Sequence, residues 1–339
     1  MAKKIRWGVL GTANIAVTKV IPGMRKSALC EIAAIASRDL RKAQDAATAQ
    51  GIPKAYGSYE DLLADPEIDA IYNPLPNHLH VPWTTKAAEA GKHVLCEKPI
   101  GLTAAEAETL IAVRERTGVK ISEAFMVLCH PQWVRLRELL RAGAIGELRV
   151  VQGCFSYYNV DPANVRNIAE IGGGGLLDIG CYMVLAGRYA FEREPLRVVA
   201  SVDRDPVTKT DRLASAMMEF GGSNGATNQA VFTCSTQLVP YQRLEFLGTT
   251  GRIELEVPVN AAPELAARLN IDTGVDLYGG GMTTETFPVC DQYGLEGDAF
   301  SRAILENAEV PVPLEAAVKN MAVMDAIFRS ERSGMWEPV

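Results

Sequence analysis

"IRWGVLGTANIA", residues 5–16, passes from an apolar strand pattern through a glycine turn into the start of a helix. The run 5–10 is apolar enough for a buried strand, and a helical pattern extends over 15–24. This order of strand, glycine turn and helix is typical of the first βαβ unit of a doubly wound parallel sheet. The stretch therefore predicts an α/β domain.

The residues that follow repeat this alternation of strands and helices. Further strand patterns lie at 32–36, 69–72, 93–96 and 119–123. Helical patterns lie between them at 40–50, 81–90 and 104–117. Strands that alternate with helices of this length build a parallel sheet through right-handed crossovers. We therefore expect residues 1–123 to form a Rossmann domain that binds a dinucleotide.

The pattern changes after residue 123. A helical pattern at 132–142 precedes a series of strand patterns with few helices between them, and glycine-rich turns at 221–225 and 248–251 favour hairpins. The strand patterns cover 148–158, 196–203, 213–220, 226–235, 243–247 and 252–257, and a last helix covers 314–332. We therefore expect residues 124–339 to form an α+β domain with a large, mainly antiparallel sheet that binds substrate.

The composition argues against several classes of partner. The chain has 339 residues, 48% of them hydrophobic and 22% charged, which is ordinary for a folded soluble protein. A net charge of −7 without a basic run argues against nucleic acid or an anionic membrane as the main partner. The first residues lack a signal-peptide pattern, and no stretch approaches the ~18 apolar residues of a membrane span. Seven cysteines without a C-x-x-C spacing are typical of reduced thiols, so we expect a cytoplasmic protein.

The glycine turn has the position of a dinucleotide fingerprint in which two glycines are replaced. Read as G-x-G-x-x-G, the fingerprint falls on Gly11, Ala13 and Ala16. Alanine is small enough for the last two positions, where backbone approaches a pyrophosphate and the helix packs on the strand. The helix dipole and the first amides of the helix can then hold the diphosphate. The residues expected to do so are Gly11, Thr12, Ala13, Asn14 and Ile15.

The residues after the second strand favour NADP over NAD. NAD enzymes usually place an acidic side chain here for the ribose 2′-hydroxyl, and that charge would repel a 2′-phosphate. This chain has Ser37 and Arg38, with Lys42 one turn on, and a hydroxyl beside a guanidinium suits a phosphate. Asp39 argues in the other direction, and a solvated loop with an unrelated arginine is the alternative. We expect NADP, bound in part through Ser37, Arg38 and Lys42.

The fourth strand pattern ends on Glu97-Lys98-Pro99, and such charges are costly at a buried strand unless solvent or a ligand lies there. Ligands of doubly wound sheets bind outside the carboxyl ends of the strands, an edge that the stretch 73–80 shares. Lys98, held by the following proline, can orient a substrate hydroxyl beside a nicotinamide. The alternative is a glutamate–lysine pair that only caps the strand. The residues expected to contact the cofactor here are Pro74, Leu75, Asn77, His80, Glu97 and Lys98.

A second motif combines four glycines at 172–175 with a carboxylate and a phenol. Asp178 and Tyr182 are four residues apart, so they share one face of a helix. A phenol of pKa ~10 becomes an acid–base catalyst near neutral pH only when a cation lowers its pKa. Lys98 and the oxidised nicotinamide can supply that charge. The alternatives are an aromatic residue at the rim of a site and a carboxylate at the start of a helix.

These motifs resemble the glucose-fructose oxidoreductase, inositol dehydrogenase and rhizopine-catabolism (Gfo/Idh/MocA) family. In order, they are GVLGTANIA, PNHLH, CEKPI, EAFM with HPQ, and GGGLLDIGCY, and together they span residues 8–182. The resemblance implies catalysis by Lys98 and an open-faced antiparallel C-terminal sheet, which often forms oligomer interfaces in this family. We therefore expect a homo-oligomer, either a dimer or a tetramer.

Tyr182 makes the chain similar to the aldose oxidoreductase and dihydrodiol dehydrogenase branches rather than to inositol dehydrogenase. The best match is to glucose-fructose and aldose-aldose oxidoreductases, whose NADP stays bound while one sugar is oxidised and another is reduced. The resemblance also implies that Arg166 lies near the cofactor and Tyr293 near the active site. Residues 127–129 depart from relatives that often have an aromatic residue and an arginine there.

Histidines and further tyrosines give candidates with two interpretations each. His78 and His80 could share a face of an extended segment, but no cysteine or carboxylate cluster completes a zinc site, so we predict no metal. His130 contacts substrate or caps the helix that begins beside it. Tyr157 and Tyr158 form a wall against a sugar or pack on a sheet. The expected substrate contacts are Lys98, His130, Tyr157, Asp178, Tyr182 and Tyr293.

The leading hypothesis is an NADP(H)-dependent aldose oxidoreductase that produces a lactone. Hydride leaves the anomeric carbon for the nicotinamide, Tyr182 takes the hydroxyl proton, Lys98 lowers the pKa of that phenol, and Asp178 positions the substrate. A second sugar could reoxidise the same bound cofactor. The alternatives are trans-dihydrodiol dehydrogenase or 3-keto-sugar oxidoreductase chemistry at the same centre, and a non-catalytic NADP sensor, against which the presence of Lys98 and Tyr182 argues.

Overall fold

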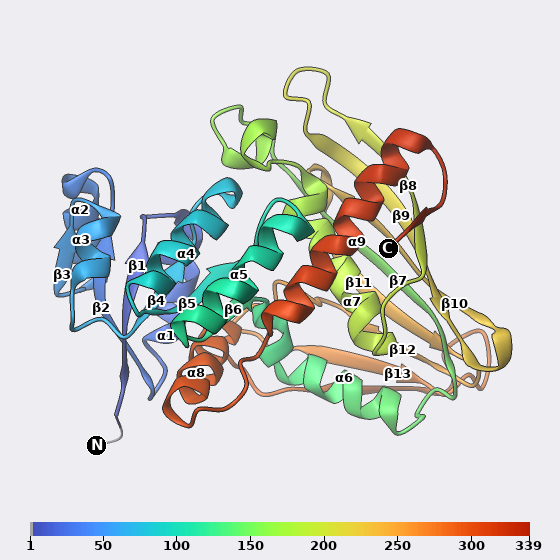
Figure 1. The fold of residues 1–339 in the computed structure, drawn as a ribbon. Coiled ribbons are helices and arrows are strands. Elements are labelled where there is room, and N and C mark those ends of the chain that lie inside the picture. Colours follow the sequence, from blue (N-terminus) through green and yellow to red (C-terminus); the bar gives the residue numbers. More distant parts are fainter. Residues whose placement is uncertain (1–2) are drawn as a thin grey trace. The chain divides into compact units, whose positions relative to one another are not determined.

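The computed structural model describes residues 3–339, which form two compact units (Figure 1). The first unit contains the described residues up to Cys129 together with Asp291–Val318. The second unit contains His130–Cys290 and Lys319–Val339. These units differ from the predicted division at residue 123 chiefly in the segment 291–318, which belongs to the first unit.

The first unit is built on a six-stranded sheet in the order β3-β2-β1-β4-β5-β6, in which all neighbouring strands are parallel. This is the order of the doubly wound nucleotide-binding fold, whose ligand crevice lies where the order reverses, between β1 and β4. The predicted Rossmann fold is confirmed. The strands are β1 Ile5–Leu10, β2 Cys30–Ala36, β3 Lys54–Tyr56, β4 Ala70–Asn73, β5 His93–Glu97 and β6 Ile121–Ala124. The helices are α1 Ile21–Met24, α2 Leu40–Gln50, α3 Tyr59–Ala64, α4 His80–Glu89, α5 Ala104–Thr117 and α8 Gln292–Leu305.

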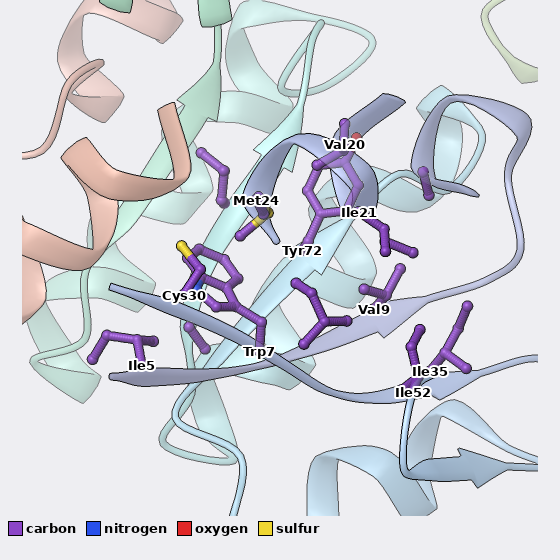
Figure 2. Close-up of a cluster of buried hydrophobic side chains, with 14 of the residues drawn as sticks. Ile5, Trp7, Val9, Val20, Ile21, Met24, Cys30, Ile35, Ile52 and Tyr72 are labelled. Atoms are coloured by element: carbon purple, nitrogen blue, oxygen red, sulfur yellow. The ribbon is translucent and has the colours of Figure 1, made fainter. Parts of the chain in front are cut away.

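Trp7 lies at the centre of the core of the first unit, where Figure 2 shows it close to Met24 and Cys30. Its indole ring is fully buried, and the ring centroid lies 5.5 Å from that of Phe300. The indole Nε1–H also donates to the hydroxyl of Ser301 at 3.3 Å. Because Phe300 and Ser301 belong to α8, this late helix completes a core that the first 129 residues leave open.

The second unit is built on a nine-stranded sheet in the order β14-β13-β12-β11-β7-β10-β9-β8-β15. Its neighbouring strands are antiparallel except for the parallel pair β10 and β7, so the predicted, mainly antiparallel sheet is confirmed. The strands are β7 Leu148–Tyr158, β8 Arg197–Arg204, β9 Asp211–Gly221, β10 Thr227–Ser235, β11 Gln237–Gly248, β12 Arg252–Leu255, β13 Arg268–Asp272, β14 Met282–Thr286 and β15 Glu337–Pro338. The helices are α6 Pro131–Arg141 and α7 Cys181–Phe191, and α9 Leu314–Ser333 runs from the first unit into the second.

Helix α7 packs on the nine-stranded sheet through a small residue. A Cβ at Gly187 would lie 2.9 Å from the Cβ of Ala230 and 3.1 Å from a methyl of Met218, so helix and sheet are in close contact. The helical stretch Ala169–Phe191 is long and apolar enough to span a membrane by length and composition, which the sequence analysis did not expect. In the structure 72% of its most apolar window is buried within the protein, as in a core helix.

Candidate functional site

The glycine turn lies at the end of β1, beside the crevice of the parallel sheet. Gly11 has φ +81°, a backbone conformation that favours glycine, and its N–H donates to the carbonyl of Ala36 at 2.7 Å. A Cβ at this position would lie 3.1 Å from Leu75 Cδ2, so the turn packs closely on the loop after β4. The π-helical turn η1 (Ala16–Val20) follows. The predicted diphosphate-binding residues 11–15 therefore lie together where the strand passes into the helix.

At the end of β2, the side chain of Arg38 is exposed, whereas the Asp39 carboxylate is hydrogen-bonded to the backbone. The Asp39 carboxylate caps α2, because its Oδ1 accepts the N–H groups of Arg41 at 3.0 Å and Lys42 at 3.4 Å. Ser37 Oγ in turn accepts the N–H of Asp39 at 3.3 Å. Arg38 is exposed, and its positive charge lies near enough to the buried Tyr59 to act on the pKa of that phenol. The carboxylate that argued against NADP is thus engaged by the helix, whereas the guanidinium is at the surface.

The loop after β4 is fixed by a buried polar network. Asn73 Nδ2 donates to the carbonyl of His80 and to Thr84 Oγ1, both at 3.2 Å. The His80 ring is 1% exposed, with Nδ1 at 2.7 Å from the Pro99 carbonyl and Nε2 at 2.6 Å from the Leu75 carbonyl. Two carbonyl partners favour the protonated ring, but burial dominates and lowers the pKa of His80 to about 4. His80 thus ties the loop after β4 to the segment after β5.

The backbone of Lys98 is held on both sides at the end of β5. The Tyr72 hydroxyl donates to Glu97 Oε1 at 2.6 Å, and the Lys98 N–H donates to Glu97 Oε2 at 3.3 Å. Beyond the cis Lys98–Pro99 bond, the N–H of Ile100 donates to Glu123 Oε1 at 2.8 Å. Lys98 itself is half-buried at the carboxyl edge of the sheet. The Glu-Lys-Pro motif therefore lies at the edge where ligands of this fold bind.

Helix α8 adds two titratable side chains near Glu97. Burial, and then the charge of Glu97, raises the pKa of both the Tyr293 phenol and the Glu296 carboxyl. Glu296 is 3% exposed, and this burial favours the neutral form of its carboxyl. Tyr293, expected to contact substrate, packs against the core cluster of the first unit.

In the second unit, the four glycines permit contacts within the chain itself. A Cβ at Gly173 would lie 2.7 Å from the carbonyl oxygens of Arg166 and Ile168. A Cβ at Gly174 would lie 1.9 Å from Asp211 Oδ1, and Gly174 has φ +125°. These positions leave no room for a side chain. The glycines thus let the turn pack against two neighbouring segments of its own unit.

Asp178 is the centre of a polar cluster in the second unit. It lies in the π-helical turn η6 (Leu176–Gly180), and its Oδ2 accepts the Tyr157 hydroxyl at 2.6 Å and Arg166 Nε at 2.9 Å. Burial and the charge of Asp178 raise the pKa of Tyr157, so this phenol remains a neutral donor. The Asp178 side chain is 14% exposed. Tyr157 and Arg166, expected at the sugar and at the cofactor, are both hydrogen-bonded to this carboxylate.

Tyr182 follows this turn in the first part of α7. It is 4% exposed, and its ring centroid lies 6.2 Å from that of Phe155 in β7. A single helical stretch thus carries both the carboxylate and the phenol that the sequence analysis singled out. Its π-helical turn is of a kind that often occurs at functional sites.

The remaining candidates have structural contacts. His130 caps α6: its Nδ1 accepts the N–H of Gln132 at 3.1 Å, and its Nε2 lies 3.4 Å from Cys290 Sγ. Burial lowers the pKa of His130 to about 4, so the ring is neutral at pH 7. The Tyr158 side chain is exposed. Within residues 3–339, no group of three or more histidine, cysteine, aspartate or glutamate side chains has the arrangement of a metal site.

Sequence reasoning missed several residues that support the candidate site. Tyr72 and Glu123 hold the segment around Lys98, and Asp211 packs against the glycine turn. Each is distant in sequence from the motif that it supports, so local spacing gives no signal. A polar residue inside an apolar strand pattern, such as Glu123 in β6, is the one sequence feature that could have indicated a role.

Comparison with known families matches both parts of the chain. Residues 5–125 match the family described as "Oxidoreductase family, NAD-binding Rossmann fold". Residues 133–254 match the "GFO/IDH/MocA C-terminal domain".

Three proteins are similar to this chain over nearly its whole length. D-xylose 1-dehydrogenase (NADP(+)) 2 of Haloferax volcanii is 40% identical, over 97% of this chain and 98% of the relative. The crystal structure of aldose-aldose oxidoreductase from Caulobacter crescentus, complexed with glycerol, has a TM-score of 0.89 at 27% identity and covers 99% of this chain and 100% of its own. The crystal structure of KijD10, a 3-ketoreductase from Actinomadura kijaniata, in complex with NADP and TDP-benzene has a TM-score of 0.88 at 29% identity. It covers 97% of this chain and 98% of its own.

Proposed function

The chain belongs to the Gfo/Idh/MocA family of NAD(P)-dependent oxidoreductases, and from this premise we propose that it oxidises aldose sugars at the anomeric carbon with NADP. The Asp178 cluster is the observation that carries the proposal. The Asp178 carboxylate is held by Tyr157 and Arg166 and its side chain is 14% exposed, and a carboxylate held in this way can accept a hydrogen bond from a sugar hydroxyl. The name of the xylose dehydrogenase relative supports both the sugar and the cofactor.

The residues at the carboxyl edge of the first sheet fit NADP. The turn at Gly11 has the glycine conformation and the strand-to-helix position of a diphosphate site. Arg38 is exposed at the end of β2, and the Asp39 carboxylate is held by α2. Residues 11–15 would hold the diphosphate, and Ser37, Arg38 and Lys42 the 2′-phosphate. The predicted contacts through Pro74, Leu75, Asn77, His80, Glu97 and Arg166 belong to the same proposal.

When bound, NADP supplies the acceptor for the hydride of the sugar C1–H. The chain supplies the proton chemistry. Tyr182 takes the proton of the anomeric hydroxyl, and the cationic Lys98 orients that oxygen and favours the phenolate. Asp178 holds a neighbouring hydroxyl of the ring. Loss of C1–H and O–H from a cyclic aldose yields a lactone, and an aldehyde sugar that accepts the hydride in a second half-reaction would complete a sugar–sugar exchange.

The test is the absorbance of reduced nicotinamide on the purified protein, before and after an aldose is added and then a second aldehyde sugar. A rise and then a fall without added cofactor would support bound NADP and the sugar–sugar reaction. A signal that requires added NADP would support an ordinary aldose dehydrogenase. No signal with glucose, xylose or other aldoses, with or without NADP, would contradict the proposal.

The similarity to a 3-ketoreductase favours a second candidate, oxidation or reduction at a ring carbon other than C1. A sugar that lacks the anomeric hydroxyl, such as a 1,5-anhydro sugar, separates the two. It cannot be oxidised to a lactone, but its other ring hydroxyls remain available. Turnover of the anhydro sugar at the rate of the parent aldose would favour the second candidate.

We also propose that the nine-stranded sheet forms the contact in a homo-oligomer, as the family resemblance implies. A shallow hollow on this sheet is lined by residues of β7 to β10, among them Val199, Met217 and Val231. Light scattering during size-exclusion chromatography should give a dimer or a tetramer. Met217→Lys should shift the protein toward the monomer, and an unchanged mass would place the contact elsewhere. A cytoplasmic location also remains a proposal.

A further inference from the structure

Asp211 is a buried carboxylate at the start of β9, in the second unit, and it has no role in the proposed hydride transfer. It is 2% exposed. Its Oδ2 accepts the backbone N–H of Leu176 at 2.5 Å. Its Oδ1 lies 1.9 Å from the position that a Cβ would take at Gly174, and its Oδ2 lies 3.4 Å from that position at Gly175. Both oxygens of Asp211 therefore face the glycine turn.

Asp211 accepts a hydrogen bond from the first N–H group of a helix. Leu176 begins the π-helical turn η6, which continues directly into α7. The first N–H groups of a helix have no partner within it, and an anion near them is favoured by the helix dipole. Asp211 thus caps this helix from a strand that is distant in sequence, and no residue adjacent to the helix start supplies a side-chain cap.

The same turn carries Asp178, two residues after Leu176. Tyr157 and Arg166 fix the end of the Asp178 side chain, and Asp211 fixes the backbone from which that side chain extends. Arg166 is also linked to the turn from the other side, because the N–H of Gly174 donates to its carbonyl at 2.9 Å. The backbone of this turn is therefore held from two sides.

The surroundings of Asp211 leave its charge only partly compensated. Burial raises the pKa of this carboxyl to about 7, against the N–H of Leu176 and the positive charge of Arg204, which lower it. Arg204 is itself engaged by Glu331, with Nη2 at 2.7 Å from Oε2, and Glu331 acts to raise the pKa of Asp211. The phenol of Tyr157 and the thiol of Cys234 also lie near enough to interact with this charge. Burying a negative charge that nearby positive groups neutralise only in part costs free energy. This cost indicates that the contact of Asp211 with the glycine turn has a function.

We propose that Asp211 is a positioning residue for the reaction: it anchors the glycine turn and the helix start so that Asp178 and Tyr182 keep the orientation that hydride transfer requires. The inference rests on the proposed function. It differs from a purely structural role in what it predicts, because a positioning residue affects the chemical step more than the binding of nucleotide or the stability of the fold.

The experiment compares Asp211→Ala, Asp211→Asn and the control Val198→Ala in the full-length protein. Asparagine keeps an acceptor oxygen for the Leu176 N–H, whereas alanine removes it. Val198 is fully buried in β8 and pairs with Met218, so its truncation weakens the same sheet at another place. Each variant is assayed for kcat and KM with an aldose, for Kd of NADPH, for thermal midpoint, and for hydrogen–deuterium exchange of the amides of 174–182.

We expect Asp211→Ala to lower kcat by roughly 10- to 100-fold with an unchanged Kd for NADPH, and to speed exchange at 174–182. Asp211→Asn should recover most of kcat, and Val198→Ala should lower the thermal midpoint without the loss of kcat. An unchanged kcat in Asp211→Ala, a parallel loss of NADPH affinity, or an equal loss of kcat in Val198→Ala would overturn the inference. If wild-type protein oxidises no aldose, the proposed function fails, and the exchange data alone decide whether Asp211 anchors the turn.

Discussion

At the scale of single residues, Lys98 is the side chain on which the proposed chemistry depends most. Its backbone is held through Glu97 on one side and through Ile100 and Glu123 on the other. Lys98→Ala should therefore leave the fold intact and the nucleotide bound while turnover falls by a factor of roughly a hundred or more. Steady-state rates and fluorescence titration with NADPH check this. Retained turnover would remove Lys98 from the mechanism.

Arg38 carries the predicted choice between NADP and NAD. It is exposed at the end of β2, and the neighbouring Asp39 is engaged at the start of α2. Arg38→Ala should raise the Kd of NADP by about 10-fold or more and change the Kd of NAD much less, because a charge-assisted contact to the 2′-phosphate is lost. Lys86→Ala, at an exposed residue of α4, serves as the control. Equal changes for both nucleotides would contradict a role in 2′-phosphate recognition.

Tyr157 tests whether the Asp178 cluster matters for the chemistry. Tyr157→Phe removes one donor to Asp178 Oδ2 and leaves Arg166 in place. A hydrogen bond to a charged group contributes about 1.5–3 kcal/mol. Its loss predicts a kcat/KM for the sugar that is roughly 10- to 100-fold lower. Tyr158→Phe, on the exposed neighbour, should have little effect. Similar losses in both variants would show that the cluster is not the cause.

At the scale of elements, the sequence predicted the long strands and helices of both units but missed the short or late ones. β3, three residues long, and the six-residue α3 are too short to show a periodic pattern. The late helix α8 was missed because its sequence contains two glycines and follows a region without clear strands. Its membership of the first unit depends on contacts with Trp7, which no local pattern can reveal.

The segment around β3 and α3 has a pH-dependent link. Burial acts to raise the pKa of Asp65, but hydrogen bonds from Lys54 at 2.8 Å and Tyr56 at 2.7 Å lower it to about 2. A carboxyl with a lowered pKa in the folded state adds stability above its unfolded pKa of about 3.9, and this stability is lost as the pH falls through about 2.

Lys54→Met should therefore lower the thermal midpoint at pH 7 by about 1–3 °C, a small effect because the lysine is partly exposed. The difference from wild type should narrow as the pH falls from about 4 toward 2. Calorimetry over this pH range measures it. A difference that stays constant down to pH 2 would mean that the Asp65 pair does not cause it.

At the scale of the whole molecule, the first unit requires a segment from the far end of the chain. Phe300, fully buried in α8, packs on Trp7 in β1. Phe300→Ala should lower the free energy of unfolding by about 3–5 kcal/mol, the usual cost of such a cavity. Denaturant unfolding followed by tryptophan fluorescence checks this. A loss below about 1 kcal/mol would mean that α8 contributes little to the core.

The fold class and the family were predictable because several motifs occur in a fixed order, and both are confirmed. The contacts that support the segments around Asp178 and Lys98 were not predictable, because they form only through tertiary structure. Tyr157 donates to Asp178, Asp211 accepts the N–H of Leu176, and Glu123 accepts the N–H of Ile100. The roles assigned to Lys98, Tyr182 and Asp178 remain predictions that rest on motif and placement.

The proposed hydride transfer is tested most directly with an aldose deuterated at the anomeric carbon. Oxidation at C1 predicts that the deuterium appears on the reduced nicotinamide, that the rate shows a primary isotope effect when chemistry limits it, and that the sugar product is the lactone. Mass spectrometry of the reduced cofactor and of the product measures both. Reduced cofactor without deuterium, together with a keto-sugar that keeps the label, would contradict oxidation at the anomeric carbon.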